Sequence, residues 1–204
     1  MGNKPKTKQT GRKNSAPKRR RVESPEPKTP WLKYGAWLVG GVIVVVLLAM
    51  AFSGLAPKEA PEGIQEFAGL SRDHVDQPVV YEQDPPVGGP HASVWINCGF
   101  YDTQVPNENA VHALEHGVVW LTYDPGLPED QLEKLRDFGE QSKVLVSPYP
   151  GLGDDVVASV WGRQLRIPTF DADTIEAFVV TQKDGPTTPE PGALCTGGIG
   201  IPAN

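Results

Sequence analysis

The sequence predicts an α+β domain, with helices on one face of a mostly antiparallel sheet, behind a single N-terminal transmembrane helix. Three observations lead to this fold class. No charged residue occurs from Tyr34 to Pro57. Beyond that stretch, short patterns typical of strands are mixed with patterns typical of helices. The segment 67–195 is long enough for one hydrophobic core and too short for two.

The N-terminal tail is basic, whereas the rest of the chain is acidic. Residues 1–33 carry eleven Lys or Arg and two Glu, a net charge of +9, and residues 34–204 carry a net charge of −15. The tail has too little apolar surface to offset its ordering entropy, so we expect it to be disordered. Next to a membrane span, such a tail would contact anionic lipids, and we expect no nucleic-acid partner.

The uncharged stretch predicts a transmembrane helix over residues 34–55. As a helix, Gly35–Leu55 would span roughly 30 Å, the thickness of the hydrocarbon core of a bilayer. The basic residues before it place the N-terminus in the cytoplasm. The linker 56–66 and the domain 67–195 would then be extracytoplasmic, attached to the cell membrane by a single pass. A cleaved signal peptide is the alternative, because Ala49-Met50-Ala51 resembles a cleavage site.

The first elements of the domain surround a short helix. Ala92–Asn97 alternates between apolar and polar residues, which predicts a strand. Asn109 is a good N-cap and Gly117 a good C-terminal stop, so we expect about two helical turns between them. The apolar run Val118–Tyr123 then predicts a strand that is buried on both faces.

The second half of the domain predicts two strands between two helices. Pro128 opens the first helix, and either Asp171 or Asp173 caps the second. The strands are Val144–Val146 and Val156–Trp161. The side chains expected to face the core from the helices are Leu132, Leu135, Phe138, Ile175, Phe178 and Val179. Residues 196–204 would form a flexible tail.

All four histidines lie between His74 and His116. If the run from His112 to His116 is helical, His112, Glu115 and His116 share one face. In a strand, the two histidines would be about 13 Å apart and could not bind one ion. A metal site at these residues therefore requires the helix.

Two further histidines extend the candidate metal site. His91 follows a stiff loop of Pro and Gly residues, and His74 is the fourth candidate ligand. Tyr81 and Tyr101 could hydrogen-bond to the ligands. Three imidazoles with a carboxylate suit Zn²⁺ or Cu²⁺. The domain has no Met, which argues against thioether copper sites. The alternative is that the histidines are buried, hydrogen-bonded structural groups.

The His-x-x-Glu-His pattern also matches inverzincin metallopeptidases. That chemistry needs a longer helix than one that stops at Gly117, and it needs a downstream Glu ligand. Glu176 is available for that role, but no feature of the sequence singles it out. The pattern therefore favours a binding domain over an enzyme.

Cys98 and Cys195 are the only cysteines in the chain. Because both lie in the domain expected outside the cytoplasm, we predict that they form a disulfide. The alternative is that Cys98, near the histidines, is a thiolate ligand.

The domain resembles a bacterial family of membrane-anchored proteins known only as a domain of unknown function. The residues that carry the resemblance are His74, Tyr81, Pro85-Pro86 through Gly89 to His91, Gly99, Tyr101, Val111–Gly117, Tyr123, Pro125, Pro148-Tyr149-Pro150, Ala158, Trp161-Gly162, Pro189-Glu190-Pro191 and Cys195. The His-x-Leu-Glu-His-Gly segment is the most specific part. Gly88 departs from the Ser expected there, so no hydroxyl is available in that loop. The resemblance implies one N-terminal anchor and an extracytoplasmic domain, without an established activity.

Three functions follow from these observations. The first is an extracytoplasmic domain that binds a divalent metal. The second is a non-catalytic structural or interaction module of a cell-envelope complex, with protein partners that the sequence does not identify. The third is a metal-dependent hydrolase that uses Glu115 as its general base.

Overall fold

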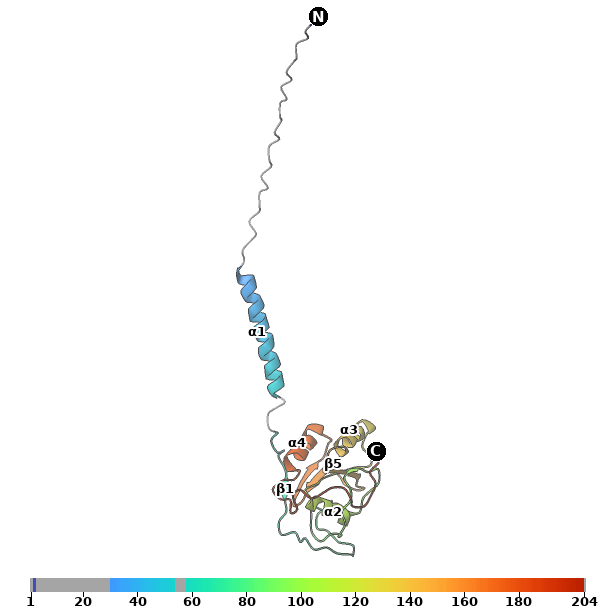
Figure 1. Ribbon diagram of the computed structural model, residues 1–204. Coiled ribbons are helices and arrows are strands. Elements are labelled where there is room, and N and C mark those ends of the chain that lie inside the picture. The colour runs from blue at the N-terminus through green and yellow to red at the C-terminus, as the bar shows by residue number, and fades with distance from the viewer. Residues whose placement is uncertain (1, 3–29, 54–57, 204) are drawn as a thin grey trace. The chain divides into compact units, whose positions relative to one another are not determined.

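The structure, a computed structural model, describes residues 2, 30–53 and 58–203 (Figure 1). Residues 3–29 of the predicted basic tail lie outside the described residues. The chain divides into two compact units, Met1–Ala56 and Pro57–Asn204.

The first unit contains helix α1, Pro30–Ser53. Side chains of α1 are described at residues 35 and 37–48, and the large apolar ones among them are 46% exposed or more. Within the described part of the chain, no helix combines the length and the apolar character required to cross a membrane.

The second unit is built on a six-stranded mixed sheet with the order β1-β6-β5-β3-β4-β2. Its strands are β1 Gln65–Glu66, β2 Gly99–Phe100, β3 Val119–Tyr123, β4 Val144–Pro148, β5 Val156–Val160 and β6 Arg163–Ile167. β4 pairs in parallel with both β3 and β2, whereas the β3–β5, β5–β6 and β1–β6 pairs are antiparallel. Three of the five strand pairs are antiparallel, in line with the prediction of a mostly antiparallel sheet, but the sheet is mixed. Helix α3 carries the chain back between β3 and β4, and such a crossover makes the two strands parallel.

Helices cover both faces of this sheet. They are α2 Asn107–Glu115, α3 Glu129–Gly139 and α4 Ala172–Gln182. Leu121 of β3 packs in one apolar cluster with residues of α3 and α4, and its neighbour Trp120 packs in a second cluster with residues of α2. Successive side chains of a strand point to opposite faces, so α2 lies on the face away from α3 and α4, as Figure 1 shows. The prediction that the helices share one face was wrong.

Residues 92–97 do not form the predicted strand. The backbone N–H of Ala92 donates to Glu108 O, and that of Ile96 donates to Asn109 O, so this segment is attached to the first turn of α2. Only isolated bridges occur nearby, between His74 and His91 and between Ile96 and Ile199. Of the large apolar residues at alternate positions, Ile96 is buried, whereas Val94 is 39% exposed, so the alternation does not correspond to one buried face.

The C-terminal segment is held against the start of the sheet. Cys98 and Cys195 form a disulfide, with their Cα atoms 5.5 Å apart. Farther along, Ile199 N donates to Trp95 O and Ala203 N donates to Phe100 O. These contacts bring residues 190–195 alongside α2, where the histidines lie.

Candidate metal centre

Helix α2 presents His112 and Glu115 on one face, as the sequence predicts. It begins three residues earlier than expected, at Asn107, with Pro106 in extended conformation as the N-cap in place of Asn109. Asn109 is therefore not the N-cap, and its side-chain amide donates instead to Val94 O at 2.6 Å. Gly117, with φ of +86°, ends the helix, because this left-handed conformation suits a residue without Cβ.

His74 and His91 come from two loop segments that are paired with each other. His91 N donates to Asp73 O at 3.0 Å, and Val75 N donates to His91 O at 2.8 Å. The two hydrogen bonds form a short parallel bridge between His74 and His91. The backbone itself therefore fixes the spacing of these two side chains.

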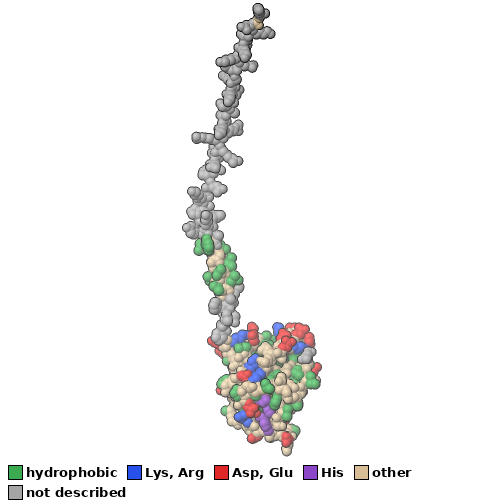
Figure 2. Space-filling model, viewed as in Figure 1, with side chains coloured by type: hydrophobic (Ala, Val, Ile, Leu, Met, Phe, Trp, Pro, Cys, Tyr) green, Lys and Arg blue, Asp and Glu red, His purple; other side chains and the backbone are tan. Residues whose placement is uncertain are grey.

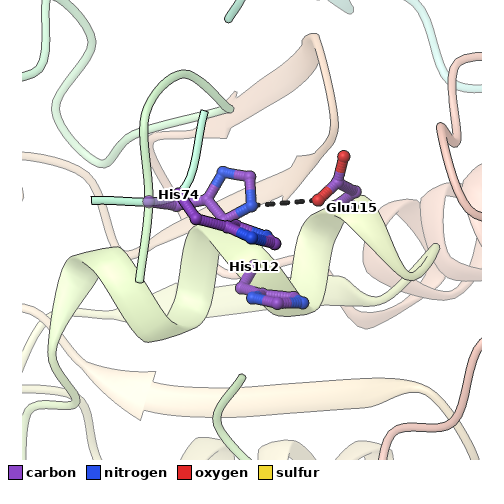
Figure 3. A group of neighbouring side chains, drawn as sticks. His74, His112 and Glu115 are labelled. Carbon is purple, nitrogen blue, oxygen red and sulfur yellow. Dashed lines mark ion pairs between the residues drawn. The ribbon is translucent and has the colours of Figure 1, made fainter. Parts of the chain in front are cut away.

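The structure brings together four of the five predicted ligands. Ligand atoms of His74, His91, His112 and Glu115 all lie within 4.8 Å of one another. Figure 3 shows the side chains of His112 and Glu115 projecting from α2 toward the same space as His74. Ligand atoms around a tetrahedral Zn²⁺ are about 3.4 Å apart, since each bond is about 2.0–2.1 Å. An ion would thus draw the most widely separated atoms of this group together by on the order of 1 Å.

The four-residue group is buried except at His74. His91 is 0% exposed, Glu115 2% and His112 5%, whereas His74 is exposed. Figure 2 shows histidine side chains, in purple, reaching the surface of the folded unit. The cluster is thus a mostly buried site with one side open to solvent.

Backbone carbonyls fix the same tautomer in three imidazoles. Nδ1 of His91 lies 2.8 Å from Gly89 O, that of His112 lies 2.7 Å from Ala92 O, and that of His116 lies 2.8 Å from Leu194 O. A carbonyl oxygen only accepts, so each Nδ1 carries the proton and donates it. Each neutral ring then has an unprotonated Nε2, the form that binds a metal.

The Nε2 atoms of His91 and His112 each lie close to another atom that carries a lone pair. His91 Nε2 lies 2.9 Å from Glu115 Oε2, and it has no hydrogen-bond partner among the described residues. His112 Nε2 lies 3.1 Å from His116 Nε2. Two lone pairs at such distances repel each other unless a proton or a cation lies between them. A shared proton or a metal ion would remove this repulsion, so the arrangement could hold a cation.

Burial lowers the pKa of His112, and the nearby imidazoles of His116, His91 and His74 lower it further. The hydrogen bond to Ala92 O acts in the opposite direction but is the smaller effect. The neutral, metal-binding form of His112 is thus favoured near neutral pH.

Two residues that the sequence did not single out complete the site. Arg72 donates through Nε to Glu115 Oε1 and through Nη2 to Glu190 Oε1 at 3.3 Å. The hydrogen bond to Glu115 raises the pKa of Arg72, so its charge is permanent. Glu190 Oε2 in turn lies 3.7 Å from His116 Nε2. Neither residue follows a spacing pattern with the histidines, which is why sequence reasoning missed both.

His116 and the two tyrosines lie around the group of four. His116 is outside that group, although its Nε2 contacts His112. Tyr81 donates to Pro90 O, beside His91, and so supports the loop that carries a ligand. Tyr101 donates to Asn97 O and contributes no described hydrogen bond to a ligand.

The remaining candidates lie elsewhere. Cys98 is bonded to Cys195, so it is not a thiolate ligand. Glu176, the acid needed for a peptidase of the inverzincin type, forms an exposed ion pair with Lys58 and is not part of the metal-ligand group.

The fold and this cluster define a small α+β domain with a His/Glu site that could hold a metal ion. Residues 74–197 match the family described as Protein of unknown function (DUF3105), and the chain belongs to that family. No curated protein matches the chain, and no solved structure matches it.

Proposed function

We propose that this domain binds one divalent transition-metal ion, Zn²⁺ or Cu²⁺, through His74, His91, His112 and Glu115. The observation that carries the proposal is that ligand atoms of three imidazoles and one carboxylate lie within 4.8 Å of one another, with His91 Nε2 2.9 Å from Glu115 Oε2. A cation between them turns repulsive contacts into bonds. Protein folding has already placed the ligands, so little ordering entropy is lost when the ion binds.

The types of ligand atom in this group limit which metal ions it can bind. Imidazoles suit Zn²⁺ and Cu²⁺, and one carboxylate is compatible with both. Sulfur ligands are absent, because both cysteines are in the disulfide and the domain contains no Met. Arg72 occupies Oε1 of Glu115, which leaves Oε2 for the ion. Glu115 would therefore be a monodentate ligand, held in place by Arg72.

A binding role fits this geometry better than hydrolysis. A general base must be free to take a proton from water. Glu115 is 2% exposed and is already engaged by Arg72 on one oxygen and faced by His91 on the other. It is better arranged to hold an ion than to activate a water molecule.

Elemental analysis of the purified full-length protein tests the proposal. We expect close to one equivalent of metal after exposure to Zn²⁺ or Cu²⁺ and desalting. Glu115→Gln removes a ligand charge at nearly constant volume and should lose most of the metal. Glu108→Gln is the matched control, because Glu108 lies on the same helix but accepts a hydrogen bond from Val79 N.

The opposite result has a clear meaning. If the wild-type protein retains no metal while both variants fold, the histidines serve packing. The domain would then be a structural or interaction module of a larger complex. A thermal melt of each variant separates loss of metal from loss of fold.

We further propose that the chain is anchored in the cell membrane by one helix, with its N-terminus in the cytoplasm and the domain outside. The support is the uncharged stretch from Tyr34 to Pro57, the basic residues before it, and the exposed apolar side chains of α1. Retention of the protein in membranes after alkaline carbonate extraction would support anchoring. Release into the soluble fraction, or a mature mass that lacks the first fifty or so residues, would contradict an uncleaved anchor.

The proposed topology has its own test. Protease added to spheroplasts should digest the domain and spare the tail. Binding of the tail to vesicles that contain anionic lipid, weakened by salt, would support lipid contact.

A further inference from the structure

His116 is not part of the four-residue group, yet it is arranged as a ligand. It is 4% exposed, its Nδ1 donates to Leu194 O, and its Nε2 lone pair faces inward. On one side of that Nε2 lies His112 Nε2 at 3.1 Å, and on the other lies Glu190 Oε2 at 3.7 Å. His116 Nε2 thus has two potential ligand atoms within 4 Å, one from His112 and one from Glu190, outside the group of four.

This second set of potential ligand atoms and the group of four share His112. A neutral imidazole whose Nδ1 is protonated has one lone pair, on Nε2, so it binds one ion at a time. An ion at the inner position (His74, His91, His112 and Glu115) and an ion at the outer position (His112, His116 and Glu190) therefore exclude each other. An ion can therefore move between the outer and the inner position if it stays bound to His112 while its other ligands are exchanged.

Exposure decreases along this path. The Glu190 side chain is 48% exposed, His116 is 4% exposed, and His91 at the inner position is 0% exposed. Glu190 is also tied to Glu115. Its backbone N–H donates to the backbone carbonyl of Glu115 at 3.0 Å, and Arg72 donates to the carboxylates of both acids. A cation attracted by the negative charge of Glu190 thus arrives beside His116. A carboxylate offsets part of its charge at the outer position (Glu190) and again at the inner position (Glu115).

We propose that His112, His116 and Glu190 form a transient outer site through which the divalent metal reaches and leaves the inner site. This proposal rests on the proposed metal binding by the inner group. It assigns Glu190 the first contact with the hydrated ion and His116 the transfer to His112. The exposed side at His74 is the competing route.

A group that binds the ion only in transit and a group that binds it at equilibrium have different effects on the binding kinetics. A group that binds the ion only in transit lowers the barrier equally in both directions. Its removal slows association and dissociation by the same factor and leaves the equilibrium constant unchanged. A group that binds the ion at equilibrium instead lowers the affinity when it is removed, mainly through faster dissociation.

Stopped-flow tryptophan fluorescence with Cu²⁺ can measure both rates on the full-length protein. The Trp95 ring lies 4.8 Å from that of His116 and 5.6 Å from that of His112, and Trp161 lies 5.7 Å from His91. A Cu²⁺ ion at either position would quench their emission. Dissociation is followed by adding a strong chelator.

Glu190→Gln and His116→Gln should each slow both rates by about ten-fold, the effect of about 1.4 kcal/mol on the barrier, with Kd changed by less than about two-fold. Glu140→Gln is the control for a general loss of negative charge, because Glu140 is exposed and outside the site. Glu190 is half exposed, so its variant should fold even if the His116 variant does not.

Two outcomes would overturn the proposal. Unchanged rates in both variants would mean that the ion passes His74 instead. A Kd weakened by ten-fold or more with unchanged association would make His116 or Glu190 a resident ligand. Absence of Cu²⁺ quenching and of bound metal in the wild-type protein would instead refute the metal-binding function itself, so the two failures are distinguishable.

Discussion

At the scale of single residues, the partner of one ring nitrogen decides what the other nitrogen can do. Gly89, Ala92 and Leu194 offer carbonyl oxygens to three different imidazoles. None of these acceptors belongs to a side chain, so no sequence motif reveals them. They leave the Nε2 lone pairs of these imidazoles free, as a metal site would require.

Arg72 compensates a buried carboxylate in the metal-free protein. Arg72→Gln leaves the charge of Glu115 without its guanidinium partner, and an uncompensated buried charge is strongly destabilising. We expect the Tm of the metal-free protein to fall by on the order of 5 °C. Added Zn²⁺ should raise the Tm of the variant more than that of the wild type, because the ion replaces the lost positive charge.

Calorimetry with and without metal measures both effects. Lys58→Gln is the matched control, since it breaks an exposed ion pair with Glu176 and should leave the Tm nearly unchanged. An Arg72 variant as stable as the wild type would show that water or another group already neutralises Glu115.

Ionisation of Tyr149 should lower the stability of the folded domain at alkaline pH. Burial, and then the hydrogen bond that its hydroxyl donates to Asp84, raise the pKa of Tyr149 to about 12. The protonated phenol is therefore favoured in the folded state, and its stabilisation is complete below the usual tyrosine pKa near 10. It is lost as the pH rises from about 10 to 12.

The comparison with Tyr149→Phe isolates this effect. Unfolding by urea at several pH values should show the wild type losing stability across this window more steeply than the variant. Parallel curves would mean that the phenol ionises no later in the folded state than in the unfolded one.

At the scale of elements, the end of α2 limits the geometry of the site. A Cβ at Gly117 would lie 2.5 Å from Asp184 Oδ1 and 3.1 Å from Asp184 Cα, and φ is +86°. Gly117→Ala should therefore lower the free energy of unfolding by about 3 kcal/mol, from backbone strain and overlap together. Weaker metal binding should accompany it, because His112, His116 and Glu115 precede this turn.

Gly151→Ala separates the contribution of backbone strain from that of steric overlap. Gly151 has a φ of +83° but no heavy atom within 4 Å of an added Cβ. It should cost only the backbone term, about 1–2 kcal/mol, and leave metal binding unchanged. Equal losses in the two variants, measured by chemical denaturation, would show that the neighbours of Gly117 yield easily.

The elements differ in how far the sequence could predict them. The buried strand β3 and the helices α3 and α4 were predicted closely, because a continuous apolar run, an N-terminal Pro and an Asp cap are local signals. Strand β6 was missed, since Arg163, Gln164 and Arg166 make it look polar. Its partners are supplied by tertiary structure: Gln164 donates to Pro85 O and Ser159, and Arg166 pairs with Asp154.

The candidate site shows the same division. The spacing of His112 and Glu115 on a helix predicts that they share a face, and the structure confirms it. The approach of His74 and His91 depends on a bridge between two loops, which no periodic pattern encodes. Arg72 and Glu190 are 118 residues apart in the chain and meet only because the C-terminal segment returns to α2.

At the scale of the whole molecule, the disulfide joins the C-terminal segment to the sheet across 97 residues. In the chain-entropy account, closing a loop of this length stabilises the folded state by about 4–5 kcal/mol. Cys98→Ser with Cys195→Ser should lower the free energy of unfolding by up to that amount. Denaturation of the wild type with and without a thiol reductant measures the same quantity without mutation, and a loss below about 1 kcal/mol would contradict the expectation.

The bonded cysteines have a consequence beyond stability. Residues 58–203 contain no methionine, and their two sulfur atoms are already oxidised in the disulfide. Peroxide and dioxygen react most readily with thiolates and thioethers, and this domain presents neither. Its candidate ligands, imidazoles and a carboxylate, would therefore be less sensitive to these oxidants than the thiolates of a cysteine-based metal site.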